Sequence, residues 1–150
     1  MPAPGSTDYS DVKDDLLHQS PEAISAMFGR VAARYDLMNH VMGAGIDLYW
    51  RWRLVRAVHA RQPARVLDLA TGSGDVLLVL KRHKAYTECA VGADFCLPML
   101  QAARAKGAAN LLAADGLHLP FPNASFDAVT IAFGLRNFAD RLAGLREMRR

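Results

Sequence analysis

The sequence predicts an α/β protein with a mainly parallel sheet, helices on both faces of that sheet, and a helical segment in front of it. Two observations carry this prediction. From residue 65 onward, short apolar runs alternate with stretches of helical length, which is the pattern of βαβ units. Before residue 62, apolar residues recur at helical spacing instead. With 150 residues, the chain has room for one domain and a small appendage.

The N-terminal part divides into a leader and a helical segment. Residues 1–20 are expected to be a flexible leader. Pro, Gly and Ser dominate its first ten residues, where few side chains can be buried, and a short helical piece is expected to follow as far as Gln19. Ser20–Glu22 is a favourable helix start, followed by an apolar stripe from Ile24 to Met42. A second helix is expected over residues 47–60. One face of it carries Leu48, Trp52, Val55 and His59. Residues 21–61 are therefore predicted to form a helical cover for a domain made by residues 62–150.

Within that domain we expect strands at residues 65–69, 89–94, 110–114 and 127–132, and helices at 75–83 and 97–106. Residues 117–125 contain two prolines and an asparagine and are expected to be a loop. A last helix from Asp140 would turn Leu142, Leu145 and Met148 inward. Such a sheet leaves an apolar strand unpaired at its edge. We therefore expect a longer fold whose C-terminal strands are missing here, although a four-stranded sheet covered by helices is a sufficient alternative.

Composition excludes several classes of function. The net charge of +3 is mild and no basic run is long, so nucleic acid is not an expected partner. Cys89 and Cys96 form no CxxC pair and no histidine stands at metal-ligand spacing, so we expect free thiols, a reducing compartment and no metal. The start is not a signal peptide, and no apolar run approaches the roughly 20 residues of a membrane span. A cytoplasmic location is expected.

The segment RVLDLATGSGD, from Arg65 to Asp75, predicts a ligand site. A strand, a glycine turn and a helix in succession bring the backbone close to a nucleotide-like ligand. Gly72 and Gly74 allow that approach because they carry no Cβ. Asp94 ends the next strand, about 20 residues further on, where a carboxylate accepts the ribose hydroxyls. Asp115 ends the third strand beside the same crevice, although both acids would also suit solvated loops.

The details of the turn indicate which cofactor it suits. A dinucleotide turn usually has a third glycine, where this chain has Leu77, and lacks an acid such as Asp68 before the turn. The pattern resembles the Rossmann-like class I S-adenosylmethionine-dependent methyltransferases. In such a site, Asp68 or backbone carbonyls would meet the ammonium of the cofactor. Phe95 would stack on its adenine, unless it is a core residue.

Two further blocks narrow the resemblance. FGRVAARYDLMNHVMGAGIDLYWR (28–51) and LPFPNASFDAVTIAFGLRNFADR (119–141) resemble the signatures of the ubiquinone/menaquinone biosynthesis C-methyltransferases. With the turn, they cover most of residues 22–150. The family methylates a ring carbon of a lipid-tailed polyprenyl quinol such as demethylmenaquinol. Its pattern continues into a Lys-Pro-Gly-Gly turn and three more strands, and Ala132 stands here in place of a small hydroxyl residue.

The resemblance implies roles for particular residues. Cofactor contacts would come from Gly72, Ser73, Gly74, Asp94, Ala114, Asp115 and the backbone of Ala132. Arg136 and Asn137 would lie by the acceptor ring, and Tyr35 would reach over it from the N-terminal helix. Arg136 stays protonated, so it suits a developing phenolate and could orient a water that takes the proton. A surface charge is the alternative for Arg136. His40 is a candidate base, although a half-buried structural histidine is the simpler interpretation, and His118, in the loop beside Asp115, is a weaker candidate.

Three other functions remain open at this point. One is a methyltransferase with a different small acceptor. Another is a fragment that binds cofactor, or associates through its edge strand, without turnover. The last is a nicotinamide-dependent oxidoreductase, which the missing third glycine disfavours. The Tyr49–Arg53 segment mixes aromatic and positive side chains, which suits peripheral contact with the inner membrane surface, although a core-packed helix is the simpler interpretation. A homodimer is also left open.

Overall fold

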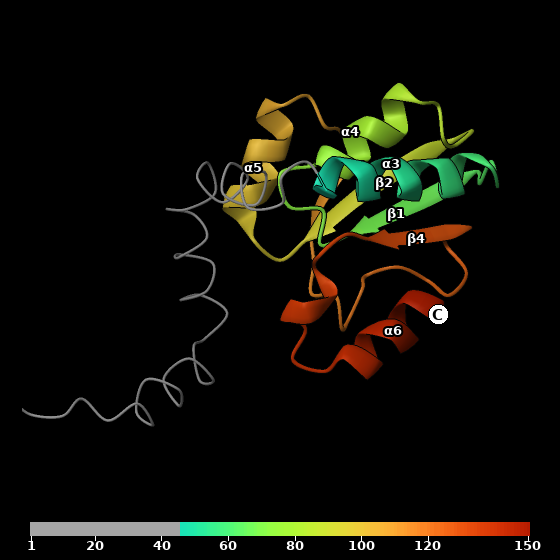
Figure 1. Ribbon diagram of the computed structural model, residues 1–150. Helices are drawn as coiled ribbons and strands as arrows, with labels where there is room; N and C mark the ends of the chain where they lie inside the picture. The colour runs from blue at the N-terminus through green and yellow to red at the C-terminus, as the bar shows by residue number, and fades with distance from the viewer. Residues whose placement is uncertain (1–45) are drawn as a thin grey trace, which may run out of the picture.

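A computed structural model describes residues 46–150, so the leader, the first predicted helix, Tyr35 and His40 lie outside the described residues. The division of the chain at residues 20 and 61 stays a prediction. The described elements alternate as expected (Figure 1). They are α3 (Ile46–His59), β1 (Arg65–Leu69), α4 (Asp75–Arg82), β2 (Cys89–Asp94), α5 (Leu97–Ala105), β3 (Leu111–Ala113), β4 (Ala128–Ile131), the 3-10 turn η1 (Leu135–Asn137) and α6 (Arg141–Arg149).

The four strands form one parallel sheet in the order β3-β2-β1-β4, which confirms the predicted fold class. β1 lies between two neighbours, and its Leu67 is in register with Val91 of β2 and Val129 of β4. The chain crosses from one edge of the sheet to the other between β3 and β4. All four carboxyl ends therefore meet along one side, with β1 and β2 at the middle.

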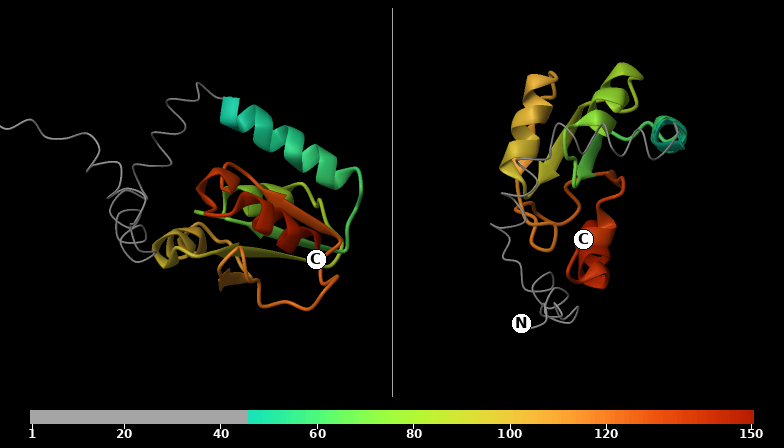
Figure 2. Two further views of the ribbon diagram at one scale, coloured as in Figure 1. Left: turned by 90° about the horizontal axis from the view of Figure 1, so that it is seen from below. Right: turned by 60° about the vertical axis from the view of Figure 1, so that its left-hand side comes forward.

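Helices lie on both faces of the sheet (Figure 2), and the alternation of side chains along β1 divides the core into two layers. Val66 packs into a cluster with residues of α3, α4 and α5, such as Val55 and Leu80. Leu67 and Leu69 point to the opposite face, where the cluster includes Met148 of α6. Because successive side chains of a strand alternate between faces, this arrangement requires apolar residues at consecutive positions, as the run in β1 provides.

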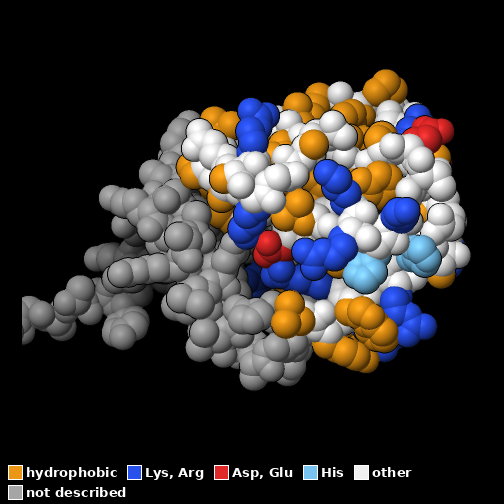
Figure 3. Space-filling view, turned by 90° about the horizontal axis from the view of Figure 1, so that it is seen from above, with side chains coloured by type: hydrophobic (Ala, Val, Ile, Leu, Met, Phe, Trp, Pro, Cys, Tyr) orange, Lys and Arg blue, Asp and Glu red, His pale blue; other side chains and the backbone are white. Residues whose placement is uncertain are grey.

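α3 packs against the rest of the domain through a small contact surface. From Leu48 onward, where side-chain burial is described, only Val55 and Val58 of the helix are buried, and the helix packs beside α4. Leu48, Trp52, Val55 and His59 lie on one face of α3 as predicted, since all four line the same groove. Leu48 and Trp52 are nevertheless about half exposed. Figure 3 shows apolar side chains on this side of the molecule interspersed with Lys, Arg and His side chains. The described helices include none that combines the length and apolar character needed to cross a membrane.

The orientation of α6 also differs from the prediction. Leu142 and Leu145 are exposed, and only Met148 of the three expected residues packs inward. The reason is Gly144, which is buried against the ring of Phe138. A Cβ at position 144 would lie 2.3 Å from that ring, so the helix approaches the domain with its glycine rather than its leucines.

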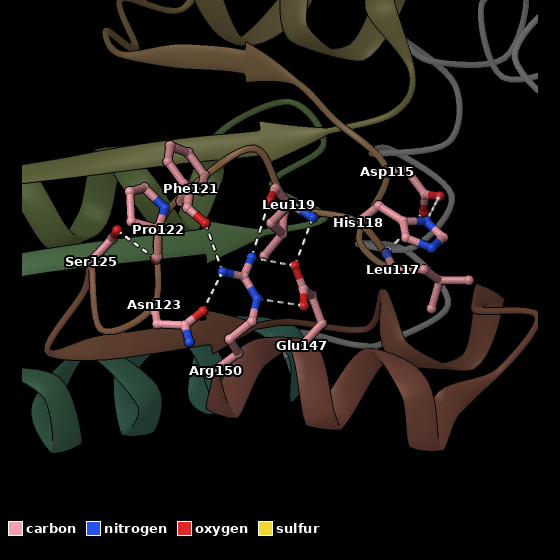
Figure 4. A network of polar contacts seen from close by, with 10 residues as sticks. All are labelled: Asp115, Leu117, His118, Leu119, Phe121, Pro122, Asn123, Ser125, Glu147 and Arg150. Atoms are coloured by element: carbon pink, nitrogen blue, oxygen red, sulfur yellow. Dashed lines mark hydrogen bonds and ion pairs between the residues drawn. The ribbon is translucent and has the colours of Figure 1, made fainter.

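The connection between β3 and β4 is pinned to α6 by an ion pair (Figure 4). Glu147 pairs with Arg150 at 2.6 Å and also accepts the backbone N–H of Leu119. The guanidinium of Arg150 in turn donates to the carbonyls of Leu119 and Phe121 and to Asn123 Oδ1. The bond from Arg150 lowers the pKa of Glu147 to about 2. The loop predicted at residues 117–125 is therefore held by specific polar contacts.

Candidate cofactor-binding site

The glycine turn after β1 is built from left-handed backbone. Ala70, Gly72 and Gly74 have φ values of 52, 56 and 78°. The N–H of Gly74 bonds to the carbonyl of Thr71 at 2.9 Å, which closes the turn, and α4 begins at the next residue. A Cβ on Gly74 would lie 2.9 Å from the Cβ of Ala103 in α5, so only glycine fits between the turn and that helix.

Asp94, at the end of β2, lies directly against this turn. Its carboxylate accepts the backbone N–H of Gly72 at 2.8 Å and that of Cys96 at 2.9 Å. The side chain is buried, and burial raises its pKa, while these N–H bonds act in the opposite direction. A carboxylate has about four acceptor positions. The backbone N–H of Phe95 is a third donor to this carboxylate, so Asp94 keeps capacity for about one further donor, such as a ribose hydroxyl.

Asp68 has two partners that sequence reasoning did not identify. Thr71 Oγ1 donates to one carboxylate oxygen at 2.6 Å, and Thr130 Oγ1 donates to the other at 2.7 Å. The residue is only 1% exposed, and burial raises its pKa to about 6 against the effect of the two hydroxyls. Asp68 thus ties the glycine turn to β4. Its predicted contact with a cofactor ammonium stays a prediction.

Ala114 and Asp115 lie where β3 ends. The N–H of Ala114 donates to the backbone carbonyl of Asp94 at 3.0 Å, which brings this segment to the edge of the same crevice. Asp115 is exposed and accepts from Leu117 N, and His118 Nδ1 lies 3.0 Å from its second oxygen (Figure 4). The bonds from Leu117 and His118 lower the pKa of Asp115, so it is ionised at neutral pH.

Phe95 extends from the same end of the sheet as Asp94. Its side chain is 45% exposed, so the alternative that it is a core residue is wrong. An exposed ring next to a buried carboxylate is available for stacking.

The GLRN segment after β4 lies against the glycine turn. A Cβ on Gly134 would stand 2.3 Å from the Cβ of Ala70, so these two backbones approach closely. Phe133, just before this glycine, has a left-handed φ of 63°. Arg136 and Asn137 follow in η1, and both are exposed. The structure therefore places the start of this segment beside the turn, although the roles of Arg136 and Asn137 stay predictions.

A cavity of about 370 Å³ opens between α3 and the end of β4. Its lining is mainly apolar and includes Ala132, the residue expected on the cofactor wall. The other lining residues are Trp50, Arg51, Arg53, Leu54, Ile131 and Phe133. A flat or elongated apolar group suits such a lining better than a charged one.

An ion-pair cluster at the start of α4 was missed. Asp75 pairs with Arg51 of α3 at 2.7 Å and with Lys106 at 2.9 Å, and Lys106 also donates to Ser73 Oγ. Partial burial would raise the pKa of Asp75, but the bonds from Lys106 and Arg51 outweigh it and lower the pKa. The hydroxyl of the buried Ser73 is thus held by Lys106. In the sequence, Asp75 directly after the glycine turn was the signal that could have indicated this cluster. Nothing in the sequence spacing identifies Lys106 as its partner.

Together, the fold and the site define a class. A parallel sheet with a glycine turn after its first strand and an acid at the end of its second is a Rossmann-like cofactor domain. The S-adenosylmethionine-dependent methyltransferase from Mesorhizobium loti matches with a TM-score of 0.54 at 26% identity, over 65% of this chain and 47% of that one. A SAM-dependent methyltransferase from Aquifex aeolicus matches with a TM-score of 0.52 at 26% identity, over 58% and 50%. The chain has the class I methyltransferase fold.

The sequence places it more narrowly. Residues 15–150 match the ubiE/COQ5 methyltransferase family, and the chain belongs to that family. It is 51% identical over 129 residues to the demethylmenaquinone methyltransferase of Thermus thermophilus, covering 83% of this chain and 58% of that protein. It is 42% identical over 141 residues to the ubiquinone/menaquinone biosynthesis C-methyltransferase UbiE of Citrifermentans bemidjiense, covering 89% and 60%. The resemblance predicted from the sequence is confirmed, and the chain spans a little over half the length of these relatives.

Proposed function

We propose that the protein transfers a methyl group from S-adenosylmethionine to a ring carbon of a polyprenyl quinol such as demethylmenaquinol. The observation that carries this proposal is the family match over residues 15–150 together with relatives named for that reaction. The geometry of the crevice supports the cofactor part independently, and nothing described favours a nicotinamide cofactor or another acceptor.

The crevice fits S-adenosylmethionine in three respects. Gly72 has a left-handed φ of 56° and a Cβ there would lie 3.3 Å from Met99, so the tight turn beside the crevice suits glycine. Asp94 offers a buried acceptor position for a ribose hydroxyl, and Phe95 offers an exposed ring for the adenine. The sugar and the base of this cofactor thus each have a matching group at the end of β2, in Asp94 and Phe95.

The cofactor supplies an electrophilic methyl group, so that a ring-carbon-to-methyl bond forms as the sulfur-to-methyl bond breaks and the ring proton leaves to water. The residues of the chain then have to orient the acceptor and stabilise its phenolate. We assign the second task to Arg136, whose guanidinium stays protonated and carries several N–H donors. Asn137, in the same η1 turn, would hold a quinol oxygen, as would Tyr35.

Cofactor binding is tested by thermal unfolding of the 150-residue chain with S-adenosylmethionine and S-adenosylhomocysteine. A ligand at about 100 times its Kd stabilises the folded state by about 2.7 kcal/mol, so the melting temperature should rise by several degrees. Asp94→Asn should abolish most of that rise. Asp127→Asn is the matched control, because Asp127 is an exposed acid that bonds Arg65 at the opposite end of β1. An unshifted parent protein would remove the cofactor assignment.

The acceptor is tested separately with methyl-labelled cofactor. We expect label in demethylmenaquinol and none in polar catechols, with the Arg136→Gln variant losing turnover while it keeps the thermal shift. If only the polar acceptors became labelled, the quinol assignment would be wrong and the protein would be a methyltransferase with a different acceptor. A quinol with a lipid tail also implies work at a membrane surface in the cytoplasm. Homodimerisation stays a prediction for sedimentation equilibrium to test.

A further inference from the structure

The outer surface of α3 carries aromatic side chains that are not buried. Tyr49, Trp50 and Trp52 are 50%, 55% and 45% exposed, and they stand among Arg53 and Arg56, which are also exposed. We name these five residues the aromatic–arginine face. Exposing large aromatic rings to water is unfavourable. Their concentration on one helix therefore indicates an interaction surface.

Both arginines of this face lie over aromatic rings and form cation–π pairs with them. The guanidinium carbon of Arg56 lies 4.7 Å from the centre of the Trp52 ring, and that of Arg53 lies 5.9 Å from the Tyr49 ring. Arg53 also donates to the Tyr49 hydroxyl at 3.0 Å. A guanidinium stacked on a ring still directs N–H donors outward, so each pair combines an apolar surface with a phosphate-binding edge.

The charge around this face is mainly positive, since Asp75, an acid that pairs with the described part of α3, is matched by Arg51 and Lys106. Residues 48–67 and 76–87 contain no Asp or Glu. The end of α4 adds the exposed cations Lys81, Arg82 and Lys84. α3 and α4 pack side by side, and Figure 3 shows their Lys, Arg and His side chains interspersed with apolar ones. The chemistry that complements this surface is anionic and has apolar material directly behind the charge.

We propose that the aromatic–arginine face docks on an anionic phospholipid bilayer. Trp and Tyr rings favour the headgroup level, where one end of the ring is apolar and the other is wet, and arginines bind the phosphates. The exposed Leu48 at the start of the face favours a bilayer over nucleic acid, because an aliphatic side chain gains from acyl chains and not from base stacking.

Docking in this orientation has a consequence for the acceptor, which rests on the proposed function. Trp50 and Arg53 belong to the docking face and also line the cavity of about 370 Å³ beside Ala132. The cavity would then open next to the bilayer, so that an apolar-tailed acceptor passes into it without crossing water. The docking itself does not depend on methyl transfer and is measured without cofactor.

The chain contains a built-in reporter for this proposal. Its two tryptophans, Trp50 and Trp52, both lie on the docking face, so intrinsic fluorescence reports on that face alone. With the 150-residue chain, phosphatidylcholine vesicles that include phosphatidylglycerol should shift the emission to the blue and carry the protein into the pellet. Pure phosphatidylcholine vesicles should do neither, and added salt should weaken the binding.

Paired variants separate docking from general charge. Arg53→Gln with Arg56→Gln should weaken partitioning by about tenfold or more, since each surface cation contributes about fivefold. Arg146→Gln with Arg149→Gln removes the same charge from exposed positions on α6, on the other side of the sheet, and should leave partitioning nearly unchanged. All four positions are exposed, and circular dichroism verifies the fold of both variants.

Three outcomes would overturn the proposal. One is equal weakening by both pairs, which would show that only net charge matters. Another is binding that ignores salt or phosphatidylglycerol. The last is a single-stranded oligonucleotide that displaces the vesicles, which would assign the face to nucleic acid. If the parent protein shows the thermal shift with S-adenosylmethionine but does not bind vesicles, docking alone is refuted. If it binds vesicles but shows no thermal shift, the cofactor assignment alone is refuted.

Discussion

At the scale of single residues, the carboxyl group of Asp68 makes stability depend on pH in a defined direction. Its pKa is raised to about 6 in the folded protein by burial, whereas an unfolded chain returns it to the ordinary value near 3.8. The folded state therefore holds the proton more tightly between these values. This contribution is fully present below about pH 4 and is lost as the pH rises through 6.

The expected result is that Asp68→Asn gains stability relative to the parent as the pH rises from 4 to 7, by about 3 kcal/mol for a shift of about two pKa units. Asparagine cannot ionise but can still bond both threonine hydroxyls. Urea unfolding of the two proteins over this pH range measures the difference, in which the other acids cancel. Parallel pH profiles would contradict the assignment.

The sequence identified the acids of the site better than their partners. Asp68 and Asp94 stand at the ends of apolar runs, where the period of a strand predicts their position. Thr130 and Lys106 carry no such signal, because their contacts depend on which strands are neighbours and in what register. The order β3-β2-β1-β4 decides that Thr130 lies opposite Asp68, and a single sequence does not state that order.

At the scale of elements, apolar period was sufficient to locate helices and strands but not to orient them. Strands and helices from residue 47 onward begin and end within two residues of the predicted bounds. The predicted inward face of α6 was wrong because this helix makes a narrow contact. In α6, the closest approach is made by Gly144, and apolar spacing cannot reveal a contact made by the absence of a side chain.

Gly144→Ala tests that contact, since two effects oppose each other there. Helix propensity favours alanine by about 1 kcal/mol, whereas a Cβ 2.3 Å from the Phe138 ring overpacks the site at a cost of about 1–3 kcal/mol. We expect net destabilisation of about 1 kcal/mol in the parent. In a Phe138→Ala background, the same change should stabilise. Urea unfolding of the four proteins gives the coupling, and an equal effect in both backgrounds would show that ring contact is unimportant.

At the scale of the whole molecule, the sheet should not open uniformly. β1 has a parallel neighbour on each side and apolar clusters on both faces, whereas β3 has three residues and one neighbour. Amide hydrogen exchange should therefore be slowest in β1 and adjoining β2, and faster in β3, β4 and η1. Mass spectrometry of peptides from these segments measures the order. Protection of β4 equal to that of β1 would contradict it.

At Ala70 and Phe133, the backbone conformation beside the crevice lowers thermal stability, so stability and function make opposite demands on these two positions. Ala70 directly follows β1 and Phe133 lies two residues after β4. Both are left-handed although neither is glycine, and each such residue stores about 1 kcal/mol or more of strain. A library selected for survival at high temperature should be enriched in glycine at position 70 or 133. The enriched clones would have a relaxed crevice mouth, and evolution at moderate temperature would tend to restore the larger side chains.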